Sequence, residues 1–347
     1  MNKKVLACLS INFVLLFAIP IYSQSTNEAV SYLSKISEQY EDIRKEMWDY
    51  TSTMAHSRSA RKVEKKRIDL LKILGKSINN VSNMQAFYND FSLRDSVVAF
   101  LTLYFNVLNN DFAKIIDMEE VAEQSYDLME AYLLAQELAN KKLEIASERI
   151  DKQYKAFANN YGVTLVENRD NISIKLKRSS EALKYYNKVY LVFFKAYKQE
   201  MYLIDALERN DINAIEQNRS ALKSISEEGL EKLIEIKHFK GDNSINSACK
   251  RILTFYIDEA ENKIPIIADF LLVTEEYNKM VAIFESKDRM LLTNEEVNKY
   301  NDAVNTYKKG INKFNITNNT LNNKRNSNIN MWNNSVSSYM SRHIPKK

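Results

Sequence analysis

Apolar residues recur at three- and four-residue steps along almost the whole chain. This spacing places them on one face of an α-helix, whereas a half-buried strand would show strict alternation. The first half of the chain therefore predicts long amphipathic helices. They cover about Val30–Met54, Val63–Val81, Val97–Leu108 and Met118–Phe157, and the third is weakened at Asn109–Asp111.

The second half repeats this pattern after residue 179. Two helices are expected over Leu183–Ile204 and Ile215–Leu233. A seventh follows the loop Gly241–Ser244 and is kinked or restarted at Pro265, because proline disrupts a helix interior. An eighth begins at the capping signal Thr293–Glu296. It includes an asparagine-rich stretch, residues 312–334, which keeps an apolar helical face and is expected to be helix and not a disordered tail.

The pattern changes between the two halves. Val163–Val166 and Ile172–Leu176 alternate in polarity around a polar centre, Asn168–Asn171. Such pieces are typical of a small hairpin or an extended connector. We therefore expect a first bundle over residues 24–161, a connector over 162–178 and a second bundle over 179–347.

The two halves share residues at a near-constant spacing. Phe87, Asp90, Ser92 and Tyr104 recur 152 positions later as Phe239, Asp242, Ser244 and Tyr256. Tyr126 and Met129 recur 151 positions later as Tyr277 and Met280. Helices share composition, so chance matches are easy, but the spacing favours an internal duplication. The expected fold is all-α, with two tandem antiparallel four-helix bundles.

The rarity of helix-breaking residues supports the helical prediction. The chain has 5 Gly and 3 Pro in 347 residues, whereas average usage would give roughly 24 and 17. Sheets and tight hairpins need these residues in turns, and long helices exclude them. The composition therefore indicates few, long elements.

The first 23 residues have the layout of a secretory signal peptide. Lys3 and Lys4 form a positive start, Val5–Ile19 is apolar, and Pro20 precedes the small residue Ser23. An uncleaved anchor and lipidation at Cys8 are the alternatives. We expect residues 1–23 to be removed and the mature chain to be exported to the periplasm, the cell surface or the medium, with no transmembrane segment.

Charge is balanced along the predicted helices. The formal charge of +4 becomes +2 without Lys3 and Lys4. The most basic run, Arg58–Arg67, continues as an ordinary amphipathic helix, so we interpret it as a solvated helix start. No nucleic-acid partner is expected, because a basic stripe is missing from the pattern.

The sequence offers no recognisable catalytic, cofactor-binding or metal site. His56, His238 and His343 have no second His or acidic residue at helical ligand spacing. Without the leader, Cys249 is the one remaining thiol, and its helical context predicts a buried small hydrophobe. We therefore expect no cofactor, no metal and no enzymatic activity.

The segment Lys324-Arg325, Trp332, Tyr339 and His343, with the paired helical halves and repeated Phe–Asp–Ser loops, resembles an uncharacterised family of helical bacterial surface proteins from spirochaetes and Bacteroidetes. The resemblance implies an envelope or surface location and supplies no functional residues. The sequence thus predicts a non-enzymatic exported scaffold that binds an envelope or extracellular partner. The alternative is a carrier of a small molecule, lipid or metal between helices.

Overall fold

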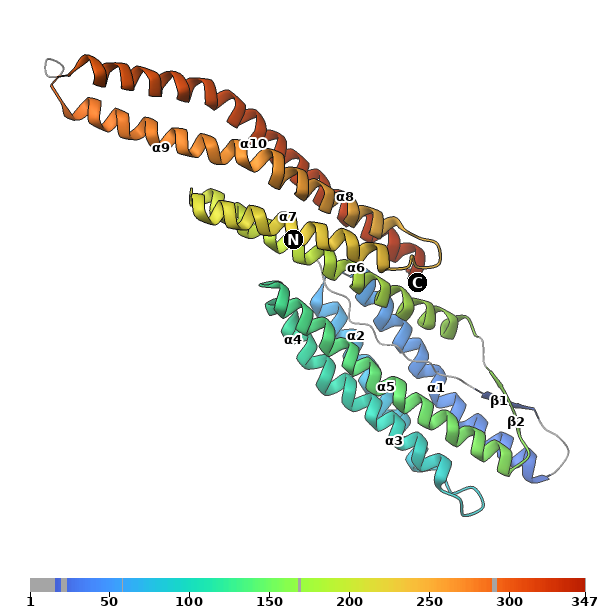
Figure 1. Cartoon of the computed structure of the whole chain (residues 1–347). Coiled ribbons are helices and arrows are strands. Elements are labelled where there is room, and N and C mark those ends of the chain that lie inside the picture. Colours follow the sequence, from blue (N-terminus) through green and yellow to red (C-terminus); the bar gives the residue numbers. More distant parts are fainter. Residues whose placement is uncertain (1–15, 20–23, 58, 168–169, 289–291, 347) are drawn as a thin grey trace. The chain divides into compact units, whose positions relative to one another are not determined.

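Within the residues that the structure describes, the fold is all-α apart from one short two-stranded ribbon (Figure 1). The computed structural model describes residues 16–19, 24–57, 59–167, 170–288 and 292–346. Contacts divide the chain into two compact units. Unit 1 comprises Met1–Asn187 with Ser337–Lys347, and unit 2 comprises Lys188–Val336.

Unit 1 is built from long helices packed side by side. Helix α1 packs on α2, α2 on α3, and both α3 and α4 pack on α5. The strands pair antiparallel, with Leu16 opposite Glu167. The elements are β1 Leu16–Ile19, α1 Gln24–His56, α2 Ala60–Ser82, α3 Ser92–Asn106, α4 Phe112–Ala122, α5 Tyr126–Asn160, β2 Thr164–Glu167 and the start of α6 Asn171–Glu208.

Unit 2 contains the rest of α6 and the helices that follow it. Helix α7 packs on α8 and more lightly on α9. The elements are α7 Ile212–Glu235, α8 Ser244–Asp258, α9 Ile264–Ser286 and α10 Asn294–His343. The last turns of α10 belong to unit 1. No helix among the described residues has an apolar stretch long enough to cross a bilayer.

The apolar faces predicted from the sequence form the interiors of both units. In unit 1, Leu33, Leu74 and Tyr104 are almost completely buried, and in unit 2 Phe193 and Trp332 are. The Trp332 indole stacks on the Phe193 ring, with centroids 4.3 Å apart and planes at 17°. The three-to-four spacing therefore identified these core positions, although Leu128 and Met201, which share the spacing, are 37% and 38% exposed.

The sequence placed one helix break wrongly. The chain stays helical through Asn109–Asp111, which lie in a π-helical turn, Val107–Asp111. The break falls after α4, and α5 restarts at Ser125, whose side chain accepts a hydrogen bond from the Leu128 N–H. A π-turn absorbs one extra residue without ending the helix, so polar residues there do not mark a stop.

The predicted connector is only partly extended. Thr164–Glu167 is a strand, but it pairs with β1 and not with Ile172–Leu176. The hairpin interpretation was therefore wrong. Helix α6 already begins at Asn171, because the Asp170 carboxylate accepts a hydrogen bond from the Ser173 N–H at 2.7 Å. Short apolar runs fit strand and helix alike, and this cap decides between them.

Local geometry recurs at a constant spacing of 152 positions. Helices α3 and α8 both have 15 residues and both run directly into a five-residue π-turn, Val107–Asp111 and Glu259–Lys263. The turns before these helices both contain a bridge between Phe and Asp, Phe87 with Asp90 and Phe239 with Asp242.

An arginine holds each π-turn. Arg67 Nη1 donates to the Leu108 carbonyl at 2.8 Å, and Arg219 Nη1 donates to the Ala260 carbonyl at 3.2 Å. Each guanidinium is paired with a glutamate three positions earlier in α2 or α7. A π-turn disturbs the regular helical ladder, and a guanidinium satisfies a carbonyl there.

Two findings depart from the expected organisation. The compact units do not follow the expected boundaries at 161 and 179, because α6 and α10 each run through both units. The pairing of Tyr126 with Tyr277 was wrong, since Tyr126 begins α5 whereas Tyr277 lies inside α9. Helix α9 is longer than α4, with 23 residues against 11, so the 152-residue spacing ends within these helices.

Candidate functional site

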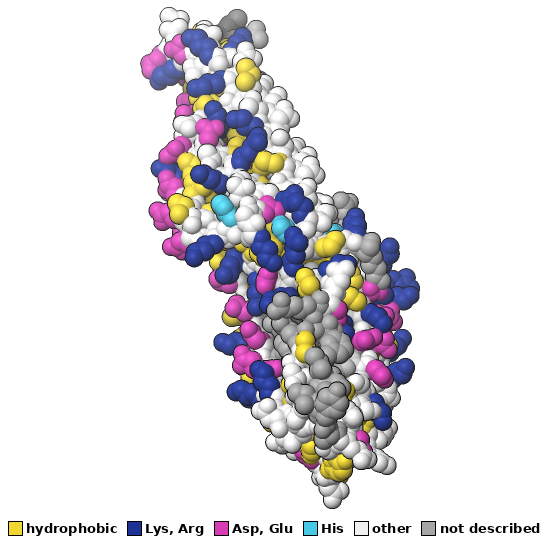
Figure 2. Space-filling model, turned by 90° about the vertical axis from the view of Figure 1, so that its right-hand side faces the viewer, with side chains coloured by type: hydrophobic (Ala, Val, Ile, Leu, Met, Phe, Trp, Pro, Cys, Tyr) yellow, Lys and Arg dark blue, Asp and Glu magenta, His cyan; other side chains and the backbone are white. Residues whose placement is uncertain are grey.

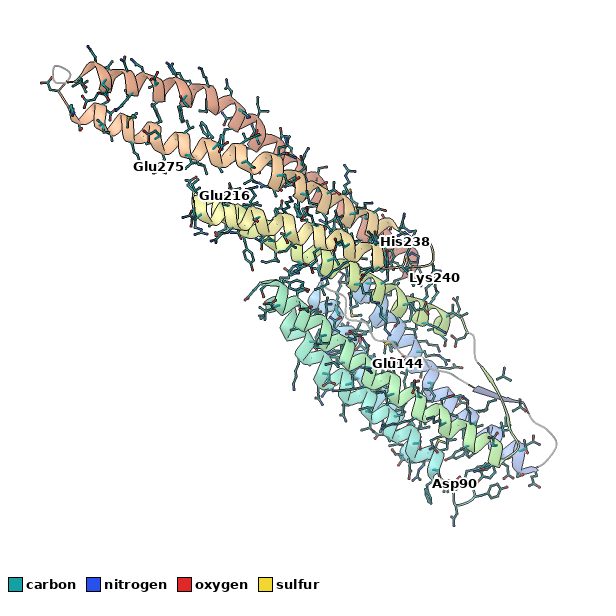
Figure 3. All side chains as sticks on the ribbon, in the orientation of Figure 1. Asp90, Glu144, Glu216, His238, Lys240 and Glu275 are labelled. Carbon is teal, nitrogen blue, oxygen red and sulfur yellow. The ribbon has the colours of Figure 1, made fainter. Side chains whose placement is uncertain are left out.

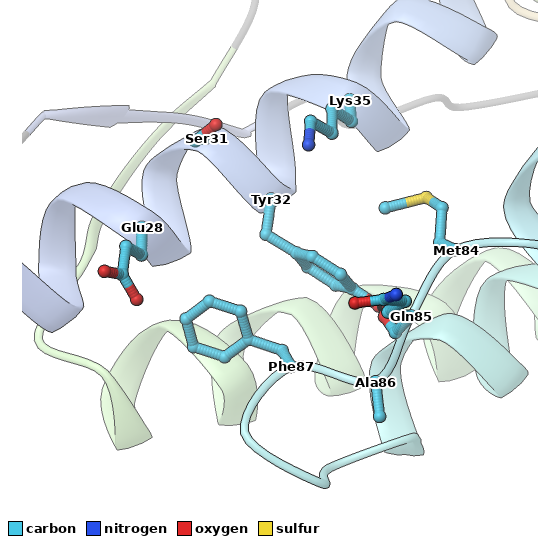
Figure 4. Close-up of a pocket in the computed structure, with 8 residues that line it drawn as sticks. All are labelled: Glu28, Ser31, Tyr32, Lys35, Met84, Gln85, Ala86 and Phe87. Atoms are coloured by element: carbon cyan, nitrogen blue, oxygen red, sulfur yellow. Dashed lines mark hydrogen bonds between the residues drawn. The ribbon is translucent and has the colours of Figure 1, made fainter.

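A pocket of about 380 Å³ opens in unit 1 between the start of α1 and the turn that joins α2 to α3. The rings of Tyr32 and Phe87 point into it, and Glu28 and Lys35 lie towards its two ends on α1 (Figure 4). The lining residues are Glu28, Ser31, Tyr32, Lys35, Met84, Gln85, Ala86 and Phe87.

The turn beside the pocket is tightly specified. Phe87 and Asp90 exchange two backbone hydrogen bonds of 3.1 and 2.8 Å. The two residues between them have positive φ, 48° at Tyr88 and 66° at Asn89, as the tightest hairpin turns require. The Asp90 carboxylate then accepts a hydrogen bond from the Ser92 N–H at 2.8 Å and starts α3.

A tyrosine at positive φ is uncommon, because its Cβ crowds the backbone there at a cost of roughly 1–2 kcal/mol. The equivalent turn of unit 2 has Lys240 at φ 49° and Gly241 at φ 81°, and Figure 3 marks Asp90 and Lys240 in the two turns. Backbone strain of this kind persists where surrounding contacts fix the conformation.

Aromatic rings supply those contacts. The Phe87 ring lies 4.7 Å from Tyr161, 5.2 Å from Tyr32 and 5.3 Å from Phe157, centroid to centroid. Tyr88 meets the edge of Phe87 at 4.8 Å. Since aromatic pairs at these distances add stability beyond burial, the cluster fixes the turn on α1 and α5.

Two tyrosine hydroxyls connect the turn to α1. The Tyr32 hydroxyl donates to the Gln85 carbonyl at 3.1 Å, and the Tyr88 hydroxyl donates to the Glu28 carboxylate at 2.5 Å. Partial burial raises the pKa of Tyr32, and the hydrogen bond to Glu28 raises the pKa of Tyr88. Both hydroxyls are therefore neutral donors at ordinary pH.

The turn also carries aromatic rings on its outer side. Tyr88 is 60% exposed, and the exposed Phe91 ring lies under the Arg94 guanidinium, 4.5 Å from its carbon. Arg94 in turn donates to the Met84 carbonyl at 3.1 Å. We call residues 84–91 the aromatic turn. Pocket and exposed rings together form a surface suited to binding a flat apolar or mixed ligand.

Unit 2 contains a different feature, a buried cluster of charged groups. Glu259 is 0% exposed and Glu200 is 3% exposed. The Arg325 guanidinium contacts both carboxylates, with Nε 3.3 Å from Glu200 and Nη2 hydrogen-bonded to Glu259. The Tyr256 hydroxyl donates to Glu200 at 2.6 Å. These four residues come from α6, α8, the π-turn and α10.

Two carboxylates share one guanidinium in this cluster, so one negative charge has no matching positive charge. One of the carboxylates therefore takes up a proton. Burial, followed by the charge of Glu259, raises the pKa of Glu200 to about 8. Burial also raises the pKa of Glu259, against the lowering effect of Arg325. One of the two carboxyl groups is therefore protonated at neutral pH, which leaves the cluster uncharged overall.

The residues singled out in the sequence lie apart from both features. Cys249 is fully buried in α8, as expected, and burial raises the pKa of its thiol. His56 bonds the Ile344 carbonyl, and His343 lies 3.1 Å from the Arg178 guanidinium. Within the described residues, no group of three His, Cys, Asp or Glu side chains is placed to hold a metal ion.

Surface charge agrees with the solvated faces predicted. On the face drawn in Figure 2, basic and acidic side chains are interspersed and form no continuous basic stripe. Two members of the basic run have internal partners, since Lys66 pairs with Asp49 at 3.0 Å and Arg67 bonds the Leu108 carbonyl.

Sequence reasoning missed the buried cluster. Glu200 lies in the apolar stripe of α6, between Phe193 and Leu203, and an acidic residue inside such a stripe was an available signal.

Comparison of the chain with family models, with curated proteins and with solved structures finds no match.

Proposed function

We propose that this chain is an exported, non-enzymatic protein of the cell envelope or surface whose helical scaffold binds a partner. The leader pattern of residues 1–23, most of which lie outside the described part of the chain, supports export. Strand β1 lies within the expected leader. A hydrogen bond joins the first turn of α1 to the end of α5, because the Thr26 hydroxyl donates to the Tyr161 carbonyl at 3.1 Å.

The scaffold is proposed to be two tandem four-helix repeats that arose by duplication. The support is the constant spacing of the Phe–Asp turns, the helices of equal length, the π-turns and the arginines that hold them. Polar details of this kind are less prone to chance matching than apolar spacing is. The proposed resemblance to helical surface proteins points to the same location.

The observation that carries the binding proposal is the aromatic turn. Tyr88 is held in a strained left-handed conformation and is 60% exposed, beside an exposed Phe91 and an open pocket. Large exposed aromatic residues on a rigid support are typical of contact sites. The proposed partner is an envelope or extracellular protein, and the reaction class is binding without catalysis.

A photo-reactive benzophenone amino acid at position 88 tests this proposal in intact producing cells. We expect a cross-linked product in the envelope fraction after illumination. The matched control carries the same amino acid at Ile234, which is 84% exposed in unit 2 and lies outside the aromatic turn. Equal products from both positions, or none from position 88, would contradict the proposal.

A second function, binding of a small molecule, is favoured by the pocket itself. Its volume of about 380 Å³ falls in the range of ligand sites, and Tyr32, Phe87 and Met84 supply apolar lining. Native mass spectrometry of protein purified from its source would then show bound mass. Substituting Met84→Trp, which fills the pocket, would remove that mass and leave the cross-link at position 88 intact.

A further inference from the structure

Helix α5 presents an apolar stripe on its outer side. Leu134, Leu138 and Ile145 are all exposed, and Leu138 is 54% exposed. At about 100° per residue these three side chains lie within about 40° of one another. The buried residues of α5, such as Tyr132 and Leu143, lie on roughly the opposite side. The stripe is therefore separate from the face by which α5 packs on the other helices of unit 1.

The stripe has the spacing of a coiled-coil seam. The positions 134, 138, 141 and 145 follow steps of four, three and four, with Lys141 as the single polar member. One side of the stripe carries acidic residues and the other carries basic or neutral ones. The acidic side holds Glu130, Glu137 and Glu144, and the other holds Ala135, Lys142 and Arg149.

We propose that α5 pairs with α5 of a second copy of this chain in a parallel two-stranded coiled coil. In a parallel pair, each residue before the seam meets the residue five positions later in the partner helix. Glu137 would then meet Lys142 of the second copy, and Glu144 (marked in Figure 3) would meet Arg149 of the second copy. Both contacts join opposite charges. Lys142 also pairs with Asp111 of its own chain at 2.6 Å, and its three N–H donors can serve both carboxylates.

The charge pattern selects this partner and this direction. In an antiparallel pair, residues on the same side of the seam meet, so Glu137 would face Glu144 of the other helix. Like charges placed opposite one another disfavour that arrangement. The pairs match within one helix sequence, which is what a self-complementary contact between identical copies requires.

The pairing is weak, because few apolar side chains form it. A stable interface buries about 800 Å² on each partner, and three exposed aliphatic residues and the flanking charges supply only part of that area. Two Lys141 side chains also meet across the seam. We therefore expect dimers at high protein concentration, with a dissociation constant above about 1 µM.

Sedimentation equilibrium of the mature chain, residues 24–347, measures the pairing directly. Leu138→Asp is expected to weaken association at least about 10-fold, and Lys141→Leu to strengthen it about 10-fold. The matched control is Ile316→Asp, since Ile316 is 68% exposed on α10 and lies outside the stripe. It should leave association unchanged. A monomer at every concentration overturns the proposal, and so does equal weakening by both aspartates.

Charge exchange tests the direction. Glu144→Arg alone should weaken the dimer, and Glu144→Arg with Arg149→Glu should restore it, because the pair is rebuilt across the seam. Lys141→Cys in the mature chain should form an intermolecular disulfide between the two introduced cysteines. Cys249 should not compete, because it is buried. Failure of the double exchange to restore association overturns the parallel arrangement. Leu138→Asp should leave the position-88 cross-link unchanged, which separates this proposal from the binding proposal.

Discussion

Two tyrosines at equivalent places have different surroundings. In unit 1 the buried Tyr104 hydroxyl lies 3.5 Å from the Met47 sulfur, and Val107 begins the π-turn. In unit 2 the buried Tyr256 hydroxyl lies 2.6 Å from the Glu200 carboxylate, and Glu259 begins the π-turn. Beside these two tyrosines, unit 1 therefore has an apolar contact and unit 2 has a charged cluster.

The comparison separates the contacts that hold the helices and turns in place from the side chains that fill the interior. The arginine–carbonyl bonds and the Phe–Asp turns occur in both units, whereas the interior chemistry differs. A buried ion pair contributes little or nothing relative to apolar residues, but loss of one partner is costly. Unit 2 therefore depends on the completeness of its cluster in a way that unit 1 does not.

Removal of Arg325 should have the largest effect. Arg325→Leu leaves Glu200 and Glu259 without their cation, so the free energy of unfolding of unit 2 should fall by about 3–5 kcal/mol at pH 7. Denaturant unfolding followed by Trp332 fluorescence in a Trp48→Phe background measures this. The neighbouring Lys324→Leu serves as control and should change stability by less than about 0.5 kcal/mol, because the Lys324–Asp258 pair is exposed.

Conversion of the whole cluster should have the opposite sign. The triple variant combines Glu200→Met, Glu259→Val and Arg325→Leu. Its Met and Val are the residues that unit 1 has at the corresponding places, Met47 and Val107. We expect the triple variant to be as stable as the unsubstituted protein, or more stable by about 1–4 kcal/mol. The same unfolding measurement decides. A loss as large as that of Arg325→Leu alone would show that the cluster is favourable in its own right.

The turns should show the smallest effects. Gly241 has φ 81° and an added Cβ would meet nothing within 4 Å, so Gly241→Ala tests backbone strain alone. It should cost about 1–2 kcal/mol. Asn89→Gly gives the first turn the residue of the second and should stabilise unit 1 by about 0.5 kcal/mol or less, since Asn tolerates this conformation. Thermal unfolding of the two variants checks both signs.

Local signals in the sequence predicted much of the fold. Thr293 and Glu296 cap α10 reciprocally, with hydrogen bonds of 3.0 and 3.3 Å, as predicted. Pro265 stands in the first turn of α9, directly after the π-turn Glu259–Lys263, and the chain stays helical there, so the helix does not restart at this proline. The asparagine-rich stretch is helical throughout. Each of these features depends on residues a few positions apart.

Features that depend on distant residues were not predicted. The pairing of β1 with β2 joins residues about 150 positions apart, and the shared proton of Glu200 and Glu259 depends on how α6 meets the π-turn. The exposure of Tyr88 follows from a turn with positive φ at Tyr88 and Asn89. A tyrosine in the sequence does not predict this backbone conformation. Spacing along one helix carries no information about these contacts.

The pH dependence of unfolding tests the buried cluster most directly. Because the pKa of Glu200 is raised from 4.5 to about 8 in the folded state, its stabilising contribution is complete below about pH 4.5 and is lost as the pH rises to 8. Urea unfolding followed by Trp332 should therefore show stability falling between pH 5 and 8, at most by about 1.4 kcal/mol per pH unit. Glu200→Gln should reduce this slope to the part that Glu259 contributes, because the pKa of that carboxyl is also raised by burial. A variant with the same slope as the unsubstituted protein would contradict the account.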